Sequence, residues 1–277
     1  MPTLERLVSS KWFLALKVMP FVLAFLGAKF LVHQLDWEPI SLGPVLTSLI
    51  AATVFLLGFL ISGTLADYKE SERLPGEVSA IFETMADDCR VIYETKGAPE
   101  ARNVLVYLRD LLDSTLNWMA KDERTNSLLD KIAGLGPHFA ALEPYTQPNF
   151  IVRLRQEQNL LRRAVLRIDT IRDTEFVKAG YTIAQIATVL LILAFVLTNI
   201  DPFYESMFLF GAVTFLLLYI LLLIEDLDNP FSYDHPFSGS RVSRKLLRDT
   251  LGRLDHEISA MQPVDSDTRR QVPVSTP

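Results

Sequence analysis

The sequence is poor in the residues from which catalytic and metal sites are built. Only one of its 277 residues is cysteine, which excludes an intramolecular disulfide and a cysteine-rich metal cluster. Its four histidines are widely separated, and none has a partner at the spacing typical of zinc ligands. Glycine-rich phosphate loops are absent as well. We therefore expect no enzyme, no catalytic residue and no metal centre of these kinds.

Charged residues are missing from particular places. The net charge is −6, and no basic block is long enough to follow a phosphate backbone, so nucleic acid is not an expected partner. The long apolar runs contain no Asp or Glu that could relay protons or bind sodium. This absence disfavours a coupled transporter and an intramembrane protease.

Apolar residues, in contrast, make up 49% of the chain and are concentrated in four runs long enough to cross a bilayer. A cleaved signal peptide is the competing interpretation of the first run, but it would leave the later helices with an odd count. No strand alternation is evident. The sequence thus predicts an all-α membrane protein whose four transmembrane helices occupy approximately residues 12–35, 39–66, 181–200 and 206–224.

The basic residues indicate how these helices are oriented. Neither of the two short links, residues 33–44 and 201–205, contains Lys or Arg. All basic residues outside the spans therefore lie in the N-terminal, central and C-terminal segments, which the positive-inside rule places in the cytosol. We expect a multi-pass protein of the cell membrane, inner or plasma, with both termini cytosolic.

This topology divides the chain into five parts. Residues 1–66 hold the first two transmembrane helices, 67–178 form a cytosolic helical region, and 179–225 hold the last two transmembrane helices. Residues 226–262 form a cytosolic segment with a short amphipathic helix, and 263–277 a disordered tail. In the central region, Pro99 is expected to start a helix, and Gly134–Pro137 to interrupt the helical run.

Two sets of basic residues allow alternative interpretations. Lys29 is either a snorkelling interfacial residue or a charge that attracts anions near the outer mouth of a pore. Arg162 and Arg163 belong to an arginine-rich face of a helix at residues 149–173. That face is either solvated and bridged to acids or part of a vestibule that concentrates anions.

The second run carries the most distinctive pattern. At 100° per residue, one stripe of the helix holds small, hydroxylated and aromatic residues: Ser48, Ala52, Phe55, Phe59, Ser62 and Ala66. Such a stripe either permits close helix packing or faces a partner or a pore.

After the fourth run, Asp226, Asp228 and Asp234 are either solvated acids at a turn or oxygen ligands for a hard cation.

These two stretches resemble the bestrophin superfamily, in particular its bacterial members. The sequence Phe55-Leu56-Leu57-Gly58-Phe59 is similar to the hydrophobic neck of the bestrophin pore, and Asn229-Pro230-Phe231 to the motif after the fourth helix. By this resemblance the second helix extends into the cytosolic region, and the neck is lined by Ala51, Phe55, Phe59 and Ser62.

The resemblance implies a homo-oligomeric channel in the lipid bilayer, a pentamer, that passes small inorganic ions. Because the second span holds phenyl rings and no carboxylate, we expect chloride or other small anions; cations, favoured by Asp67 and Glu70 just inside the neck, are the alternative. Bestrophins with a calcium clasp carry a dense acidic run after their motif, whereas this chain has one acid there, which argues against bound calcium. The alternative function is a non-conducting membrane scaffold or sensor whose cytosolic helices recruit a partner.

Overall fold

The computed structural model describes residues 12–120, 123–173, 178–228, 230–231 and 242–261. These residues are almost entirely helical and divide into two compact units. The first unit spans Met1–Ser71 and Ile171–Val242, and the second Glu72–Thr170 and Ser243–Pro277. A single helix, α3 (Pro44–Lys96), contributes to both units and confirms the predicted extension of the second transmembrane helix.

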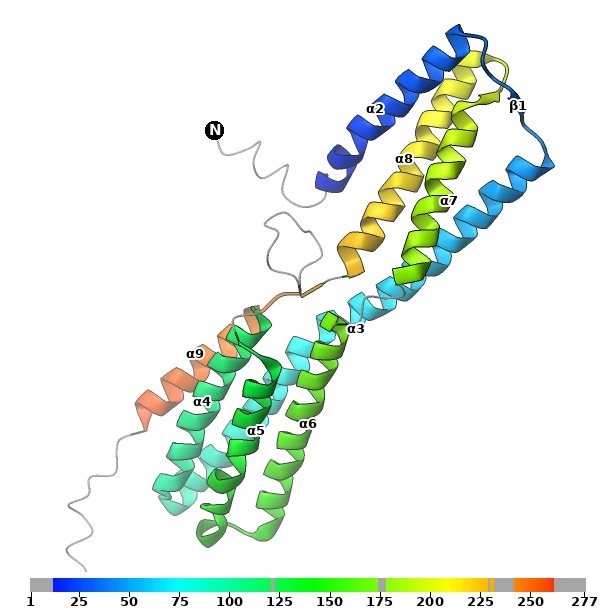
Figure 1. Cartoon of the computed structure of the whole chain (residues 1–277). Coiled ribbons are helices and arrows are strands. Elements are labelled where there is room, and N and C mark those ends of the chain that lie inside the picture. The colour runs from blue at the N-terminus through cyan, green and yellow to red at the C-terminus, as the bar shows by residue number, and fades with distance from the viewer. Residues whose placement is uncertain (1–11, 121–122, 174–177, 229, 232–241, 262–277) are drawn as a thin grey trace, which may run out of the picture. The chain divides into compact units, whose positions relative to one another are not determined.

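The first unit contains four helices that are long and apolar enough to cross a membrane. They are α2 (Phe13–Gln34), the N-terminal part of α3, α7 (Lys178–Val196) and α8 (Phe203–Asp228). These are the four predicted spans, so the protein is an all-helical membrane protein (Figure 1).

Leucine and aromatic side chains hold the first unit together. Leu57 and Leu60 of α3 share an apolar cluster with Leu191 of α7 and Phe210 of α8. α2 lies along α8, and the Leu26 side chain fills the space beside Gly211, where a Cβ would approach it to 3.4 Å. The missing side chain at Gly211 therefore lets these two helices approach closely.

The links between the spans also form a small parallel strand pair, which the sequence did not predict. β1 (Ile40–Ser41) pairs with β2 (Thr198–Asn199). Two residues per strand are too few to show the apolar alternation by which a strand is recognised. The pair explains why α7 ends at Val196, four residues before the predicted end of the third span.

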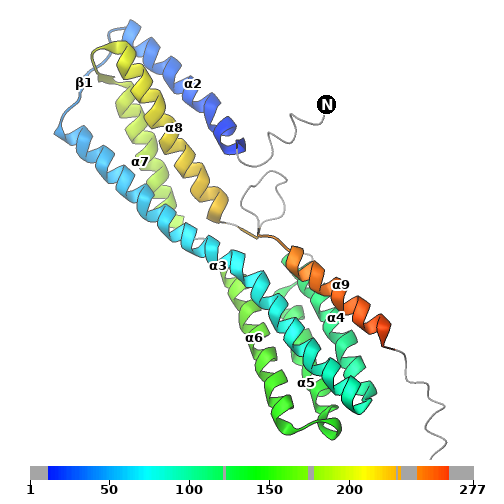
Figure 2. The same cartoon turned by 180° about the vertical axis from the view of Figure 1, so that it is seen from behind.

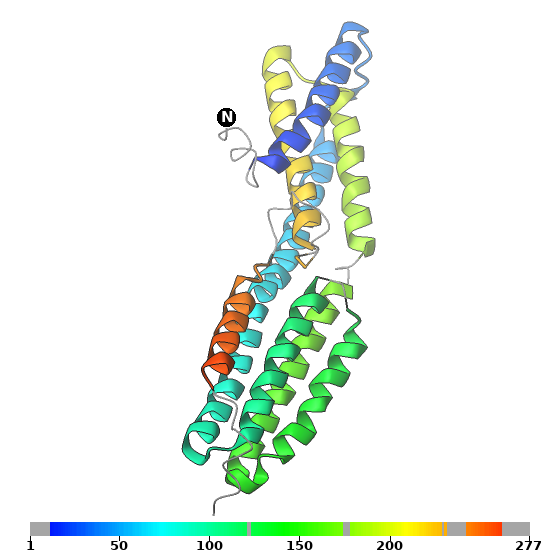
Figure 3. The same ribbon diagram turned by 90° about the vertical axis from the view of Figure 1, so that its left-hand side faces the viewer.

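The second unit is a helical bundle. Besides the C-terminal part of α3 it contains α4 (Pro99–Met119), α5 (Thr125–Ala140), the 3₁₀ turn η1 (Glu143–Tyr145), α6 (Pro148–Asp173) and α9 (Lys245–Ala260) (Figure 3). Its interior is formed by fully buried side chains, among them Phe82, Leu108, Trp118 and Leu161. Pro99 lies in the first turn of α4, as predicted.

The expected interruption at Gly134–Pro137 is wrong, because α5 continues to Ala140. The two glycines serve packing instead. The Tyr107 hydroxyl lies over Gly134 and donates a hydrogen bond to the Lys131 carbonyl at 2.7 Å, and Arg155 Nη2 donates to the Gly136 carbonyl at 3.1 Å.

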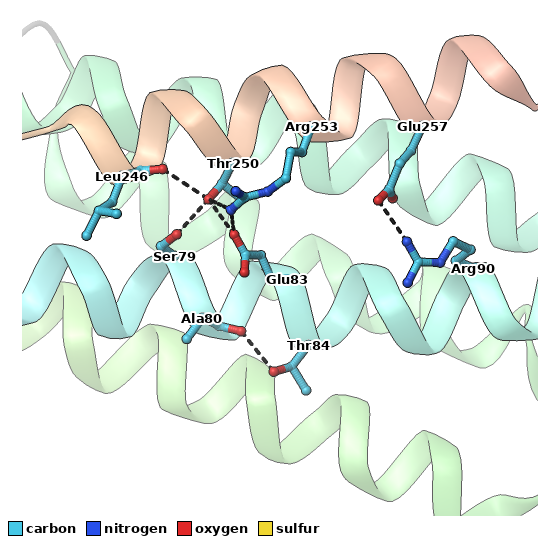
Figure 4. Close-up of polar contacts among 9 residues, drawn as sticks. All are labelled: Ser79, Ala80, Glu83, Thr84, Arg90, Leu246, Thr250, Arg253 and Glu257. Atoms are coloured by element: carbon cyan, nitrogen blue, oxygen red, sulfur yellow. Dashed lines mark hydrogen bonds and ion pairs between the residues drawn. The ribbon is translucent and has the colours of Figure 1, made fainter.

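Polar side chains fasten α9 to α3 within the second unit. The Thr250 hydroxyl lies 2.6 Å from the Ser79 hydroxyl and donates to Glu83 at 2.9 Å, while Arg253 forms an ion pair with the same glutamate (Figure 4). One turn after Arg253 on α9, Glu257 accepts a hydrogen bond from Arg90 Nη1 of α3 at 2.9 Å. Glu83, Arg90, Arg253 and Glu257 line a groove between α9 and α3, and their charges are therefore paired within the chain.

Candidate pore-lining face of α3

The predicted stripe of the second transmembrane helix is the face of α3 that the rest of the chain leaves uncovered. Phe55 and Phe59 are 76% and 63% exposed, and Ala51 and Ser62 are exposed as well. We call these four residues the neck face. The opposite side of the helix, with Leu57 and Leu60, is buried in the apolar cluster of the first unit.

The neck face differs in composition from the other uncovered surfaces of the spans. The exposed apolar residues of α7 and α8 are bulky, as is typical of side chains that face lipid: Ile183, Ile186, Leu190, Leu193, Phe208, Leu209 and Leu216. Around Phe55 and Phe59, α3 also exposes Val54 and Leu65, but most of its exposed residues there are small: Ser48, Ala51, Ala52, Gly58, Ser62 and Ala66. Small residues let neighbouring helices approach each other closely.

Hydroxyl groups along α3 are partly satisfied by its own backbone. The Ser48 hydroxyl donates to the Pro44 carbonyl at 2.8 Å, and Thr53 on the buried side donates to the Leu49 carbonyl at 2.8 Å. Such bonds to the preceding turn let polar side chains occupy a membrane helix without a partner from another helix.

Lys29 was predicted either to snorkel to the interface or to attract anions near a pore mouth, but within the single chain it is buried. Its side chain is 1% exposed, and its ammonium group donates to Glu38 Oε1 at 2.7 Å and to the Thr198 carbonyl. Lys29 therefore does not snorkel to an interface, and its charge is paired with Glu38 inside the first unit.

Sequence reasoning missed the partners of Lys29. The other carboxylate oxygen of Glu38 lies 3.4 Å from Nδ1 of His33, whose ring stacks on Phe203. Burial raises the pKa of Glu38, but the hydrogen bonds from Lys29 and His33 outweigh it and hold that pKa below its usual value. The available signal was a lysine within a span, which calls for a carboxylate near by; Glu38 is nine residues further on.

Arg162 and Arg163 lie on α6 in the second unit, half-buried and exposed respectively. Their neighbours on the same arginine-rich face are paired within the chain: Arg153 lies 3.3 Å from Asp88, and Arg155 binds the Gly136 carbonyl. The predicted anion-attracting residues do not form one group, since Lys29 belongs to the first unit and the two arginines to the second.

The acidic cluster after the fourth span is only partly described. Asp226 and Asp228 lie in the last turn of α8, beside Glu225, which accepts a hydrogen bond from Tyr181 at 3.3 Å. Asp234 lies outside the described residues. Within the ranges that the structure describes, no three His, Cys, Asp or Glu side chains are arranged to hold a metal ion.

Comparison with known proteins places this arrangement in a structural class. No protein-family model and no curated protein matches the sequence. Solved structures do match: a point mutant of a bacterial bestrophin homologue from Klebsiella pneumoniae superposes with a TM-score of 0.73 at 17% identity, covering 88% of this chain and 100% of that one.

Two further solved structures agree. The Klebsiella pneumoniae homologue solved by zinc phasing has a TM-score of 0.69 at 17% identity, covering 91% of this chain and 99% of that one. Another, described only as a mutated membrane protein, has a TM-score of 0.75 at 16% identity and covers 89% and 100%. The chain is a four-span helical membrane protein. Its fold is that of the bacterial bestrophin homologues.

Proposed function

We propose that this protein is an oligomeric ion channel in which the neck face of α3, repeated in each subunit, lines the narrowest part of the pore. The observation that carries the proposal is the neck face itself: two large phenyl rings and small residues are left uncovered on one side of a membrane helix. The bestrophin fold and the resemblance of residues 55–59 to the bestrophin neck support the same assignment.

The mechanism follows from the apolar character of the face. Rings of Phe55 and Phe59 around an axis make a constriction with no polar group to replace the hydration shell of an ion. Such a constriction closes by losing its water and conducts when a slight widening lets water return. No moving plug is required.

The proposed charge selectivity is for chloride or similar small anions. Phenyl rings that meet the pore edge-on present the positive rim of their quadrupole to a passing anion. The transmembrane part of α3, residues 44–66, contains no carboxylate that would form a cation-selective ring. Both termini lie in the cytosol in this proposal, as the distribution of basic residues indicates.

The homo-oligomer is proposed to be a pentamer, as the resemblance implies. The neck face cannot enclose a pore within one chain, because it lies on the uncovered side of a single helix. Several copies around an axis would cover it and bring the small residues of neighbouring α3 helices together.

A conductance measurement tests the proposal. Phe55→Ala combined with Phe59→Ala widens the constriction and removes the apolar barrier, so purified protein in planar bilayers should show a severalfold higher conductance. Phe208→Ala is the matched control, because Phe208 is a phenylalanine of α8 that is also 76% exposed. Its current should equal that of the unmodified protein. Unchanged conductance in the α3 double variant, or the same increase in the control, would contradict the pore assignment.

The same recordings test selectivity. In a salt gradient, the reversal potential of the unmodified channel should lie near the equilibrium potential of chloride. A reversal potential near that of the cation would overturn the anion assignment and leave the neck assignment standing.

A further inference from the structure

The buried ion pair between Lys29 and Glu38 joins three parts of the first unit that are distant in sequence. Lys29 belongs to α2, Glu38 to the link between α2 and α3, and the Thr198 carbonyl, the second acceptor of the ammonium group, to β2. The side chains of Lys29 and Glu38 are only 1% and 7% exposed. We call these three groups the linker anchor.

The polar groups of this anchor are well satisfied. The ammonium group has two acceptors, and Glu38 receives Lys29 on one oxygen and faces His33 on the other. A buried ion pair adds little stability compared with well-packed apolar residues of the same size, because both charges lose their hydration. Its clearer effect is geometric, since the hydrogen bonds are satisfied only when all three segments take one arrangement.

The link that contains Glu38 leads directly into α3. Asp36 adopts a left-handed backbone (φ 49°), which Asp tolerates better than most residues, and turns the chain away from α2. Two residues after Glu38, the Ile40 amide donates to the Leu197 carbonyl at 3.1 Å and β1 pairs with β2. Helix α3 then begins at Pro44.

Packing alone holds the start of α3 weakly. Of residues 44–48 only Leu46 is buried, as a member of the apolar cluster, and only the backbone ribbon of α3 at this end is separated from the ribbons of α7 and α8 (Figures 1 and 2). Leu49 and Ile50 are only partly buried, and the most deeply buried side chains of α3 in the first unit, Thr53, Leu57 and Leu60, come about two to four turns after Leu46. The position of the first turns therefore depends on how the link is fastened.

We propose that Lys29 and Glu38 are positioning residues that fix the N-terminal end of α3, and with it the entrance to the neck face. The effect on conduction rests on the proposed channel function, whereas the effect on the position of the helix does not. Loss of the anchor frees the link and loosens the first three turns of α3, including Leu46, while the α2–α8 contact and the rest of the apolar cluster remain.

Hydrogen exchange of the full-length protein in detergent tests the positional part without any current. Lys29→Met and the volume-matched pair Lys29→Met with Glu38→Met should both raise amide exchange in residues 36–54 by about tenfold or more, with residues 184–192 and 210–217 unchanged. Lys17→Met is the matched control, because Lys17 is an exposed lysine of the same helix, and it should change neither region.

The double variant separates positioning from the penalty of a lone buried charge, because it leaves no unpaired charge. Faster exchange only in the single variant, a uniform increase over all four spans, or no change in residues 36–54 would each overturn the proposal. If Lys29→Met does not fold, the double variant decides the question alone.

Conductance and rescue test the functional part. Both anchor variants should alter the single-channel conductance of protein that elutes as the normal oligomer, and Lys29→Arg should restore it, because a guanidinium can reach the same two acceptors. Unaltered conductance together with locally faster exchange would overturn the link to the neck. If Phe55→Ala with Phe59→Ala has no effect on current while exchange rises locally, the pore assignment fails and the anchor stands.

Discussion

In the second unit, the pKa values of Asp88, Glu123 and Glu157 depart from their usual values. Asp88, on α3, is the most buried of these three acids. The residue is 6% exposed, and Arg153 Nε lies 3.3 Å from its Oδ2, within the distance of an ion pair. Burial raises the pKa of Asp88 above its usual value, Arg153 opposes this shift, and the neighbouring Asp87 adds to it. The ionised form of Asp88 is therefore less favourable in the folded protein than in the unfolded chain.

The raised pKa of Asp88 makes the stability of the folded protein depend on pH. Since the folded-state pKa is the higher one, the ionised Asp88 costs stability above that pKa. The cost disappears as the pH falls through the folded-state pKa towards the unfolded value near 3.8. Asp88→Asn should therefore raise the melting temperature at pH 8, and its advantage over the unmodified protein should shrink as the pH is lowered.

Thermal unfolding of the detergent-solubilised protein at a series of pH values measures this difference. Asp130→Asn serves as the control, because Asp130 is an exposed carboxylate of the same unit, and its melting temperature should follow that of the unmodified protein. An advantage of Asp88→Asn that is constant with pH, or that grows on acidification, would show that the ionised carboxylate carries no cost.

At the scale of the elements, α5 shows how two glycines and a proline can be accommodated inside a helix. Gly134 leaves room for the hydroxyl of Tyr107, which binds the Lys131 carbonyl, and Gly136 leaves its carbonyl open to Arg155. Pro137 lies one turn before the helix ends at Ala140, so the hydrogen bond that it removes is near the terminus. Tertiary contacts outweigh the weak helix propensity of this stretch.

A double-mutant cycle can measure this contact. Gly134→Ala should lower the melting temperature, because the new methyl group collides with the Tyr107 hydroxyl, although alanine is the better helix former by about 1 kcal/mol. In a Tyr107→Phe background, where the hydroxyl is absent, the same substitution should be neutral or stabilising. A coupling free energy between residues 134 and 107 that is zero within experimental error would contradict the proposed collision.

Gly252 of α9 is the matched control for this cycle, since no heavy atom lies within 4 Å of the position that its Cβ would take. Gly252→Ala should raise the melting temperature through helix propensity alone, and the gain should be independent of residue 107.

The four spans and most of the helices of the second unit could be predicted, because their apolar residues recur at helical spacing over many turns. The uncovered face of α3 was also predictable, since its small, hydroxylated and aromatic residues recur on one stripe of the helix. The helix through Gly134–Pro137 was not, because the contacts of Tyr107 and Arg155 come from other helices. The second acceptor of Lys29, the Thr198 carbonyl, was hidden for the same reason, because it is 169 residues away in sequence.

At the scale of the whole molecule, the composition of the uncovered surfaces distinguishes lipid from protein as a neighbour. In the proposed assembly, the bulky exposed residues of α2, α7 and α8 contact acyl chains, whereas the neck face of α3 contacts other copies of α3 or lines the pore. Charges in the groove between α9 and α3 are already paired within the chain, so this groove offers a recruited partner few free charges.

The proposed channel and the non-conducting scaffold differ in how several chains assemble. A channel needs the neck faces of all subunits to meet around one axis, with the phenyl rings directed into the opening. A scaffold can remain a monomer or dimer, with the small residues of α3 packed against a neighbouring helix and no opening between subunits.

An image of the purified full-length particle in detergent or nanodiscs decides between the channel and the scaffold. At a resolution that separates helices, we expect a closed ring of five subunits with one α3 helix from each subunit nearest the axis, and with residues 51–62 at its narrowest level. A monomer, a dimer, or a ring in which α3 lies at the periphery would contradict the channel.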